Sequence, residues 1–219
     1  MKRNLLKNIF LSLCLVVFPM GMAAKQEATV TSPSGNLTLT AGVDKAGRPY
    51  YSLSRGKEAI LLPSYLGVKL KDGSLDSDFG VMGFVRATKD ETWHQPWGEE
   101  NDVRNHYNEL TMKLAQRKGL KRQLTIVFRV FDDGMGFRYV FPEQKNLKHF
   151  VIMDEETEFC FKGDPEAWTL PYDADYYEGL WTKEPLSKKQ KVCTPITIEA
   201  KPDLYMMLHE ANLTDYASL

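Results

Sequence analysis

Apolar and polar residues alternate in short segments along most of the chain, and turn-forming residues separate these segments. The segments cover residues 36–43, 50–55, 59–63, 66–74, 83–90, 106–116, 122–142, 150–155, 195–200 and 203–211. Alternation with a period of two is typical of a strand with one buried face, and strands at roughly ten-residue spacing favour an antiparallel sandwich or barrel. Because no long segment has the period of an amphipathic helix, the sequence predicts an all-β fold.

The clearest local feature is a hairpin in residues 127–141, VFRVFDDGMGFRYVF. Aromatic and β-branched residues stand on both sides of Asp133-Gly134, and an Asp-Gly pair between two strand-like segments is a strong turn signal. An EF-hand calcium loop is excluded because the acidic spacing and the distal glutamate are missing. We therefore expect two paired strands around this turn.

The last strand-like segment raises a question of charge. One face of it holds Leu204, Met206, Leu208 and Glu210, while His209 lies on the other face. An unpaired carboxylate in a low-dielectric setting costs several kcal/mol. Glu210 therefore needs a cation, a base or a metal beside it, or a strand end that is open to water.

The N-terminus has the pattern of a secretory signal. A basic start is followed by an apolar run over residues 9–22 and by the small residues Ala23 and Ala24. The run is shorter than the ~20 residues that a membrane-spanning helix needs, although an N-terminal anchor is the alternative. We expect residues 1–24 to be a cleaved signal peptide, and residues 25–219 to be secreted into the periplasm.

Composition narrows the possible partners. The formal net charge is −1 and there is no long basic tract, which argues against nucleic acid. No segment after the signal is long and apolar enough to span a membrane. Cys160 and Cys193 are the only cysteines after the signal, and they either pair in an oxidising compartment or remain two buried thiols.

Two segments are rich in aromatic residues. Residues 162–192 break the strand pattern and are expected to form a long loop, with aromatic side chains Trp168, Tyr172, Tyr176, Tyr177 and Trp181. These side chains either hold the loop against the sheet or a neighbouring domain, which is favoured, or form a binding surface.

The run ETWHQPWGEENDVRNHYNEL, residues 91–110, combines aromatic rings with charged groups. Rings offer apolar faces to sugars while carboxylates and amides bond their hydroxyls. A structural role is still favoured, since nothing in the sequence fixes the ~5–9.5 Å carboxylate separation of a glycosidase.

The usual motifs of other enzyme classes are missing. The sequence has no glycine-rich phosphate loop before a helix, no HExxH, no paired CxxC and no GxSxG. In contrast, ETWHQPWGEENDVRNHYNEL, VFRVFDDGMGFRYVFP and LHEANLTDY, in this order behind a secretory signal, resemble the N-terminal region of glycoside hydrolase family 97.

This resemblance implies a fold, an activity and a partner domain. The fold would be a β-super-sandwich of the galactose-mutarotase-like kind, packed against a following catalytic (β/α)₈ barrel. The whole enzyme would be an exo-acting hydrolase of α-linked oligosaccharides, either α-glucosides or α-galactosides. Its catalytic carboxylates would lie on the barrel, so we expect no catalytic residue in this chain, which ends before the barrel begins, and no activity from this chain alone.

The resemblance also suggests an answer to the question of Glu210. In the family, the N-terminal domain lends a glutamate to a calcium ion in the active site, and the glutamate of its HEA motif corresponds to Glu210. Oxygen ligands suit a hard divalent cation. The remaining ligands would come from the barrel, and His209, on the opposite face, is not expected to bind the ion. The alternative to this enzyme domain is a stand-alone carbohydrate-binding or structural β-sandwich.

Overall fold

The computed structural model describes residues 26–173, 176, 178–214 and 216. The predicted signal peptide, residues 1–24, lies outside the described residues. Within them, every regular element is a β-strand except one 3₁₀ turn, Leu186–Lys188. All strand pairs are antiparallel, so the all-β antiparallel fold predicted from the alternating pattern is confirmed. The described part of the chain contains no helix that is long and apolar enough to cross a membrane.

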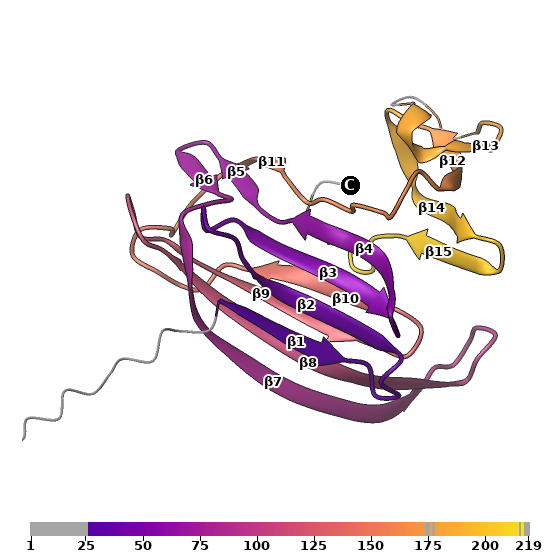
Figure 1. Ribbon diagram of the computed structural model, residues 1–219, viewed down its shortest axis with the longest axis horizontal. Helices are drawn as coiled ribbons and strands as arrows, with labels where there is room; N and C mark the ends of the chain where they lie inside the picture. The colour runs from indigo at the N-terminus through magenta and orange to yellow at the C-terminus, as the bar shows by residue number, and fades with distance from the viewer. Residues whose placement is uncertain (1–25, 174–175, 177, 215, 217–219) are drawn as a thin grey trace, which may run out of the picture.

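Two four-stranded sheets pack face to face and form the main body (Figure 1). The first sheet has the order β1-β2-β3-β4, with strands Glu27–Thr31, Leu37–Val43, Pro49–Arg55 and Glu58–Tyr65. The second has the order β10-β9-β8-β7, with strands Met135–Val140, Gln123–Val130, Asp102–Gln116 and Phe79–His94. Each sheet follows the chain order because short turns join neighbouring strands.

The core lies between these two sheets, where alternate residues point inward. Tyr51 at its centre is fully buried, and its ring lies 5.3 Å from Phe137 and 6.0 Å from Phe128, between ring centroids. Its hydroxyl donates a 2.9 Å hydrogen bond to the carbonyl of Glu158. Burial raises the pKa of Tyr51, because the charged form would lose its hydration. The core therefore keeps this hydroxyl neutral and bonded.

The hairpin predicted around Asp133-Gly134 is confirmed. Strands β9 and β10 pair from Met135↔Val130 to Val140↔Thr125, and the backbone N–H of Phe131 donates to the carbonyl of Gly134 at 2.8 Å. A second hairpin, β7–β8, is longer than its sequence suggests. The polar and aromatic residues of positions 91–105, which lacked a clean alternation, extend both strands into a ribbon that projects past the sandwich in Figure 1.

Two smaller sheets complete the described fold. One has the order β11-β5-β6, with strands Ile152–Glu155, Val68–Leu70 and Gly73–Leu75. The other, called the small sheet below, has the order β13-β12-β14-β15, with strands Thr182–Pro185, Glu166–Pro171, Val192–Lys201 and Leu204–Leu208.

The small sheet corrects one prediction. Residues 162–192 were expected to form a loop, but they contain β12, β13 and the 3₁₀ turn. Prolines and clustered rings hid the alternation in this segment. Strand β12 is held on one side by β14, about thirty positions later in the chain, and such non-local pairing leaves no local signal.

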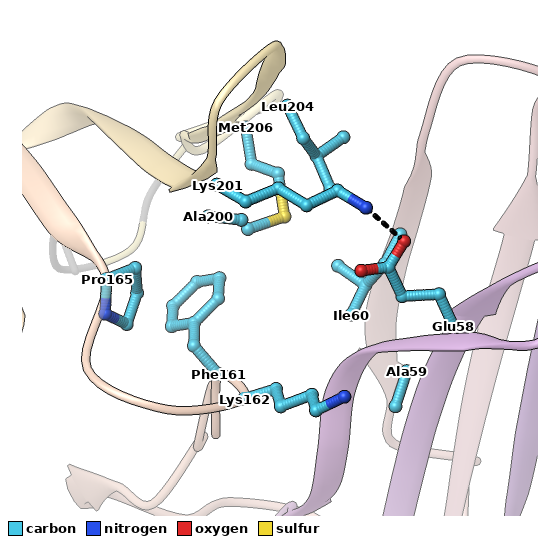
Figure 2. Close-up of a pocket in the computed structure, with 10 residues that line it drawn as sticks. All are labelled: Glu58, Ala59, Ile60, Phe161, Lys162, Pro165, Ala200, Lys201, Leu204 and Met206. Atoms are coloured by element: carbon cyan, nitrogen blue, oxygen red, sulfur yellow. Dashed lines mark hydrogen bonds and ion pairs between the residues drawn. The ribbon is translucent and has the colours of Figure 1, made fainter.

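A bridge of packed side chains joins the small sheet to the sandwich. Phe161 forms an isolated β-bridge with Leu61, and its ring packs against the cores of both units. Met206 of β15 also packs against both cores. At the rim, the Nζ of Lys201 lies 2.5 Å from the Oε2 of Glu58 (Figure 2). The small sheet is therefore fixed to the sandwich through both apolar and charged contacts.

The two cysteines are free thiols in the structure, and both are half-buried. The sequence left open whether Cys160 and Cys193 form a disulfide, and in the structure they do not. The Sγ of Cys160 lies 3.7 Å from the Oε2 of Glu158, and burial raises the pKa of this thiol.

Candidate functional site

The sequence singled out Glu210, and the structure places it just after the last strand. Strand β15 ends at Leu208, three residues before the end of the predicted segment 203–211. The alternation of burial nevertheless continues, because Leu208 and Glu210 are half-buried whereas His209 is exposed. This burial pattern is the one expected if the glutamate and the histidine face opposite ways, which stays a prediction.

The surroundings of Glu210 bear on whether it could bind a metal. It forms no hydrogen bond or ion pair with another residue of the described part of the chain. The described residues also contain no group of three or more His, Cys, Asp or Glu side chains that could hold a metal ion. Because calcium takes six to eight oxygen ligands, Glu210 fits a calcium site only as one contributor among several.

The charged groups of the run 91–110 are mostly used to hold the β7–β8 ribbon together. Arg104 donates two hydrogen bonds to Asp90, at 2.8 and 2.7 Å, and these bonds lower the pKa of the Asp90 carboxyl. Asn105 donates to Glu91 at 2.9 Å, and Lys89 pairs with the same carboxylate at 2.8 Å. An isolated two-stranded ribbon is only marginally stable, so the two cross-strand pairs, Arg104–Asp90 and Asn105–Glu91, support the structural interpretation of this run.

Two tryptophans near the tip of the ribbon have no such structural role. The exposed fractions of Trp93 and Trp97 are 52% and 82%. His94 lies 3.2 Å from Asp102 across the hairpin, between Nδ1 and Oδ1. The ribbon therefore presents rings and charges to solvent, but it brings no cluster of polar groups around them.

The outer face of the small sheet is a second aromatic surface. Directly paired residues of neighbouring strands share a face, and the register aligns one row of them across all four strands. This row holds Lys183, Trp168, Thr197 and Met207, and the adjoining row holds Glu166, Glu199 and Tyr205. The inner face carries the buried residues Ala167, Ile196 and Ile198.

Lys183 forms ion pairs with two glutamates on this outer face. Its Nζ lies 2.8 Å from Glu166 and 2.7 Å from Glu199, and 4.5 Å from the centroid of the Trp168 ring. The hydrogen bond to Glu166, followed by that to Glu199, raises the pKa of Lys183. The two glutamates are directly opposed in the register, so the ammonium group between them offsets their repulsion.

A shallow hollow lies beside this charged group. It is lined by Trp168, Trp181, Thr197 and Tyr205, which we call the aromatic platform. The rings of Trp168 and Tyr205 lie 6.1 Å apart at an angle of 41°. Trp181 and Tyr205 have exposed fractions of 53% and 58%. Two aromatic rings of the platform thus lie open to solvent on a rigid sheet.

The sequence had indicated part of this platform. Trp168 and Trp181 belong to the aromatic segment noted above, and Tyr172 and Tyr176 of that segment are exposed, while Tyr177 lies outside the described residues. The sequence interpretation missed Lys183, Thr197 and Tyr205. Tyr205 alternates with the inward residues of β15, which marked it as outward-facing, but its neighbour Trp168 comes from the unpredicted β12.

Comparison with known proteins places the chain among carbohydrate-active enzymes. A family model described as glycosyl-hydrolase 97 N-terminal matches residues 30–219. A retaining alpha-galactosidase of Bacteroides thetaiotaomicron is 28% identical over 229 residues, which cover 97% of this chain and 33% of that protein. A probable retaining alpha-galactosidase of Streptomyces bingchenggensis is 26% identical, over 83% of this chain and 28% of that protein.

Solved structures give the same picture. A glycoside hydrolase family 97 enzyme from Pseudoalteromonas sp. strain K8, solved in complexes with panose and with acarbose, aligns with a TM-score of 0.83 and 32% identity. The alignment covers 87% of this chain and 29% of that one. A beta-arabinopyranosidase, at 24% identity and a TM-score of 0.78, shares the fold. The chain spans about a third of the length of the curated relatives it matches.

Proposed function

Because the chain belongs to glycoside hydrolase family 97 and carries its N-terminal domain, we propose that it serves a longer, calcium-dependent, exo-acting α-glycoside hydrolase. In this role the chain shapes one wall of the sugar pocket and lends Glu210 to a calcium ion. The acid and the base or nucleophile come from a catalytic barrel that follows in the same enzyme. After removal of residues 1–24, the enzyme works outside the cytoplasm on α-linked oligosaccharides.

Two findings support a domain rather than a complete enzyme. The matched relatives are about three times as long as the chain, which covers 33% and 28% of them. Glycoside hydrolysis also needs two carboxylates that flank the scissile bond at a defined separation. The opposed pair that the small sheet does provide, Glu166 and Glu199, is bound by Lys183 in a structural arrangement.

The position of Glu210 carries the calcium part of the proposal. Glu210 is half-buried and has no hydrogen-bond or ion-pair partner among the described residues, so its carboxylate oxygens are available to a shared cation. Phe161 and Met206 fix the small sheet to the sandwich and thereby fix the strand that precedes Glu210. When bound, the ion would supply positive charge that holds substrate oxygens in place. The contribution of this chain is to hold the Glu210 carboxylate at a constant position.

A domain exchange tests the proposal. The chain from residue 26 onward replaces the N-terminal third of the Bacteroides relative, and hydrolysis of aryl α-galactoside and α-glucoside is measured. We expect turnover by the chimera that is lost with a calcium chelator and restored by calcium, and no turnover by the chain alone. The relative without its N-terminal third is the control and should be inactive.

Some outcomes would contradict the proposal. Turnover by the chain alone, abolished by a point mutation within it, would show that the chemistry lies here. A folded, monodisperse chimera whose turnover is unaffected by the chelator would remove the calcium role. If the truncated relative is fully active without any N-terminal domain, the chain would instead be a stand-alone carbohydrate-binding or structural sandwich.

A further inference from the structure

The aromatic platform combines features that individually have structural explanations but together resemble a ligand surface. The inner face of the same sheet already provides the packing that the fold needs, through Ala167, Ile196 and Ile198. The outer face is therefore not required for the core. It still exposes more than half of the Trp181 and Tyr205 side chains, 53% and 58%. Large exposed rings grouped in one hollow are a common sign of a binding surface.

The ring geometry suits flat, partly apolar molecules. Trp168 belongs to strand β12 of the small sheet, and the ammonium group of Lys183 lies over its ring, 4.5 Å from the ring centroid. Tyr205 approaches the same ring at 6.1 Å with an interplanar angle of 41°, so the two rings form an open angle rather than a closed stack. Aromatic rings have apolar faces and, in Tyr and Trp, a polar edge. The C–H face of a pyranose ring matches such a surface.

The polar groups beside the rings discriminate between ligand classes. Lys183 has three N–H donors, of which its ion pairs with Glu166 and Glu199 use two. Each carboxylate accepts bonds at about four lone-pair positions, of which the ammonium uses only part. A ligand rich in hydroxyls can bond these remaining positions while the ion pairs stay intact.

The same charges disfavour a dry protein interface. Covering Glu166, Lys183 and Glu199 with an apolar partner surface would remove water from three ionised groups, and the desolvation cost can exceed the Coulombic gain. A carbohydrate avoids this cost because its hydroxyls replace the water. At the tip of the β7–β8 ribbon, Trp97 is 82% exposed and lies in no hollow of the kind that the platform lines.

We propose that the aromatic platform, Trp168, Trp181, Thr197 and Tyr205, is an oligosaccharide-binding surface of this chain. One sugar ring lies against Trp181 and Tyr205, and its hydroxyls bond to the group formed by Lys183, Glu166 and Glu199. This inference goes beyond the proposed function, because it requires neither calcium nor a catalytic barrel. It can hold if the calcium proposal fails, and the reverse is also true.

Calorimetric titration of the chain with maltotriose and with raffinose tests the inference. We expect saturable binding of at least one trisaccharide, with a dissociation constant on the order of 1 mM. Trp181→Ala and Tyr205→Ala should each weaken binding about tenfold, which corresponds to the ~1.4 kcal/mol of a good aromatic contact. Lys183→Met keeps the rings but disturbs the charged group, and it should also weaken binding. Circular dichroism verifies that each variant is folded.

Trp97→Ala is the matched control, because it removes an exposed tryptophan from the ribbon instead of the platform, and binding should be unchanged. The inference is wrong if neither trisaccharide binds at about 10 mM. It is equally wrong if sugar binds but Trp181→Ala and Tyr205→Ala retain the affinity of the parent chain. Loss of binding in Trp97→Ala alone would move the site to the ribbon.

Discussion

Replacing Phe161 with alanine should weaken the attachment of the small sheet to the sandwich. This ring packs against the cores of both units, and Figure 2 shows it among residues of both. Its backbone forms the isolated bridge to Leu61. The substitution leaves the backbone bridge in place and removes only the ring. Met206 would then be the main apolar contact that spans the junction.

The expected cost follows from the burial of the ring. Removing a fully buried phenylalanine side chain costs about 3–5 kcal/mol, including the cavity that is left. Phe161 is half-buried, so we expect a loss of roughly 2–3 kcal/mol in the free energy of unfolding. The ion pair between Lys201 and Glu58 is exposed and would compensate only slightly.

Urea denaturation followed by two signals measures this loss. Circular dichroism reports mainly on the larger sandwich. In a background in which Trp93 and Trp97 are replaced by phenylalanine, the fluorescence of Trp168 and Trp181 reports on the small sheet. We expect both midpoints to fall, with the fluorescence transition moving to lower urea than the dichroism transition. Met153→Ala, at a position that is 63% exposed, is the control. A change below about 0.5 kcal/mol in Phe161→Ala would refute the reasoning, because that is the range of ordinary surface substitutions.

Three further predictions concern single side chains. In the active chimera, Glu210→Gln should weaken calcium binding and lower turnover without changing the melting temperature of the calcium-free protein. His209→Ala should leave calcium affinity unchanged. Equal affinities of all three proteins in a calcium titration would exclude Glu210 as a ligand. Tyr51→Phe should cost about 1–2 kcal/mol of unfolding free energy in urea, since the Glu158 carbonyl loses its buried donor, and a neutral result would mean that water replaces the bond. Arg122 lowers the pKa of Asp72 below its ordinary value of 3.8 in the folded state, so this pair stabilises the protein above that pH, and the stabilisation is lost as the pH falls below it. In Asp72→Asn the melting temperature should therefore fall less steeply as the pH is lowered through the acid range. An unchanged dependence of the melting temperature on pH would contradict the assignment.

Much of the sandwich could be predicted because its strands are local and half-buried. The β9–β10 hairpin has an Asp-Gly turn between strongly alternating strands, so its pairing follows from neighbouring residues. The last strand could also be predicted from its alternation, although β15 begins one residue later and ends three residues earlier than the predicted segment 203–211. In these places the hydrophobic pattern and the turn chemistry point to the same structure.

The small sheet could not be predicted in the same way. Strand β12 is short, ends in Pro171, and pairs with β14 after an intervening strand and a 3₁₀ turn. Its identity as a strand therefore depends on a partner distant in the sequence. The same is true of the aromatic platform, because Trp168 and Tyr205 become neighbours only through β14, which pairs with both of their strands.

The two faces of the small sheet suggest why a carboxylate follows its last apolar residues. The inner face needs Met206 and Leu208 for packing, and Glu210 continues that face beyond the strand end. A position on this row is fixed by the packing of the residues before it, whereas a position on the outer row would move with the solvent-exposed side chains. A metal ligand must be held within a few tenths of an ångström, so it benefits from a well-packed support. If Glu210 binds calcium, the apolar residues before it are the means by which the fold sets its position, and Phe161→Ala should then weaken calcium binding in the chimera even though Phe161 is no ligand.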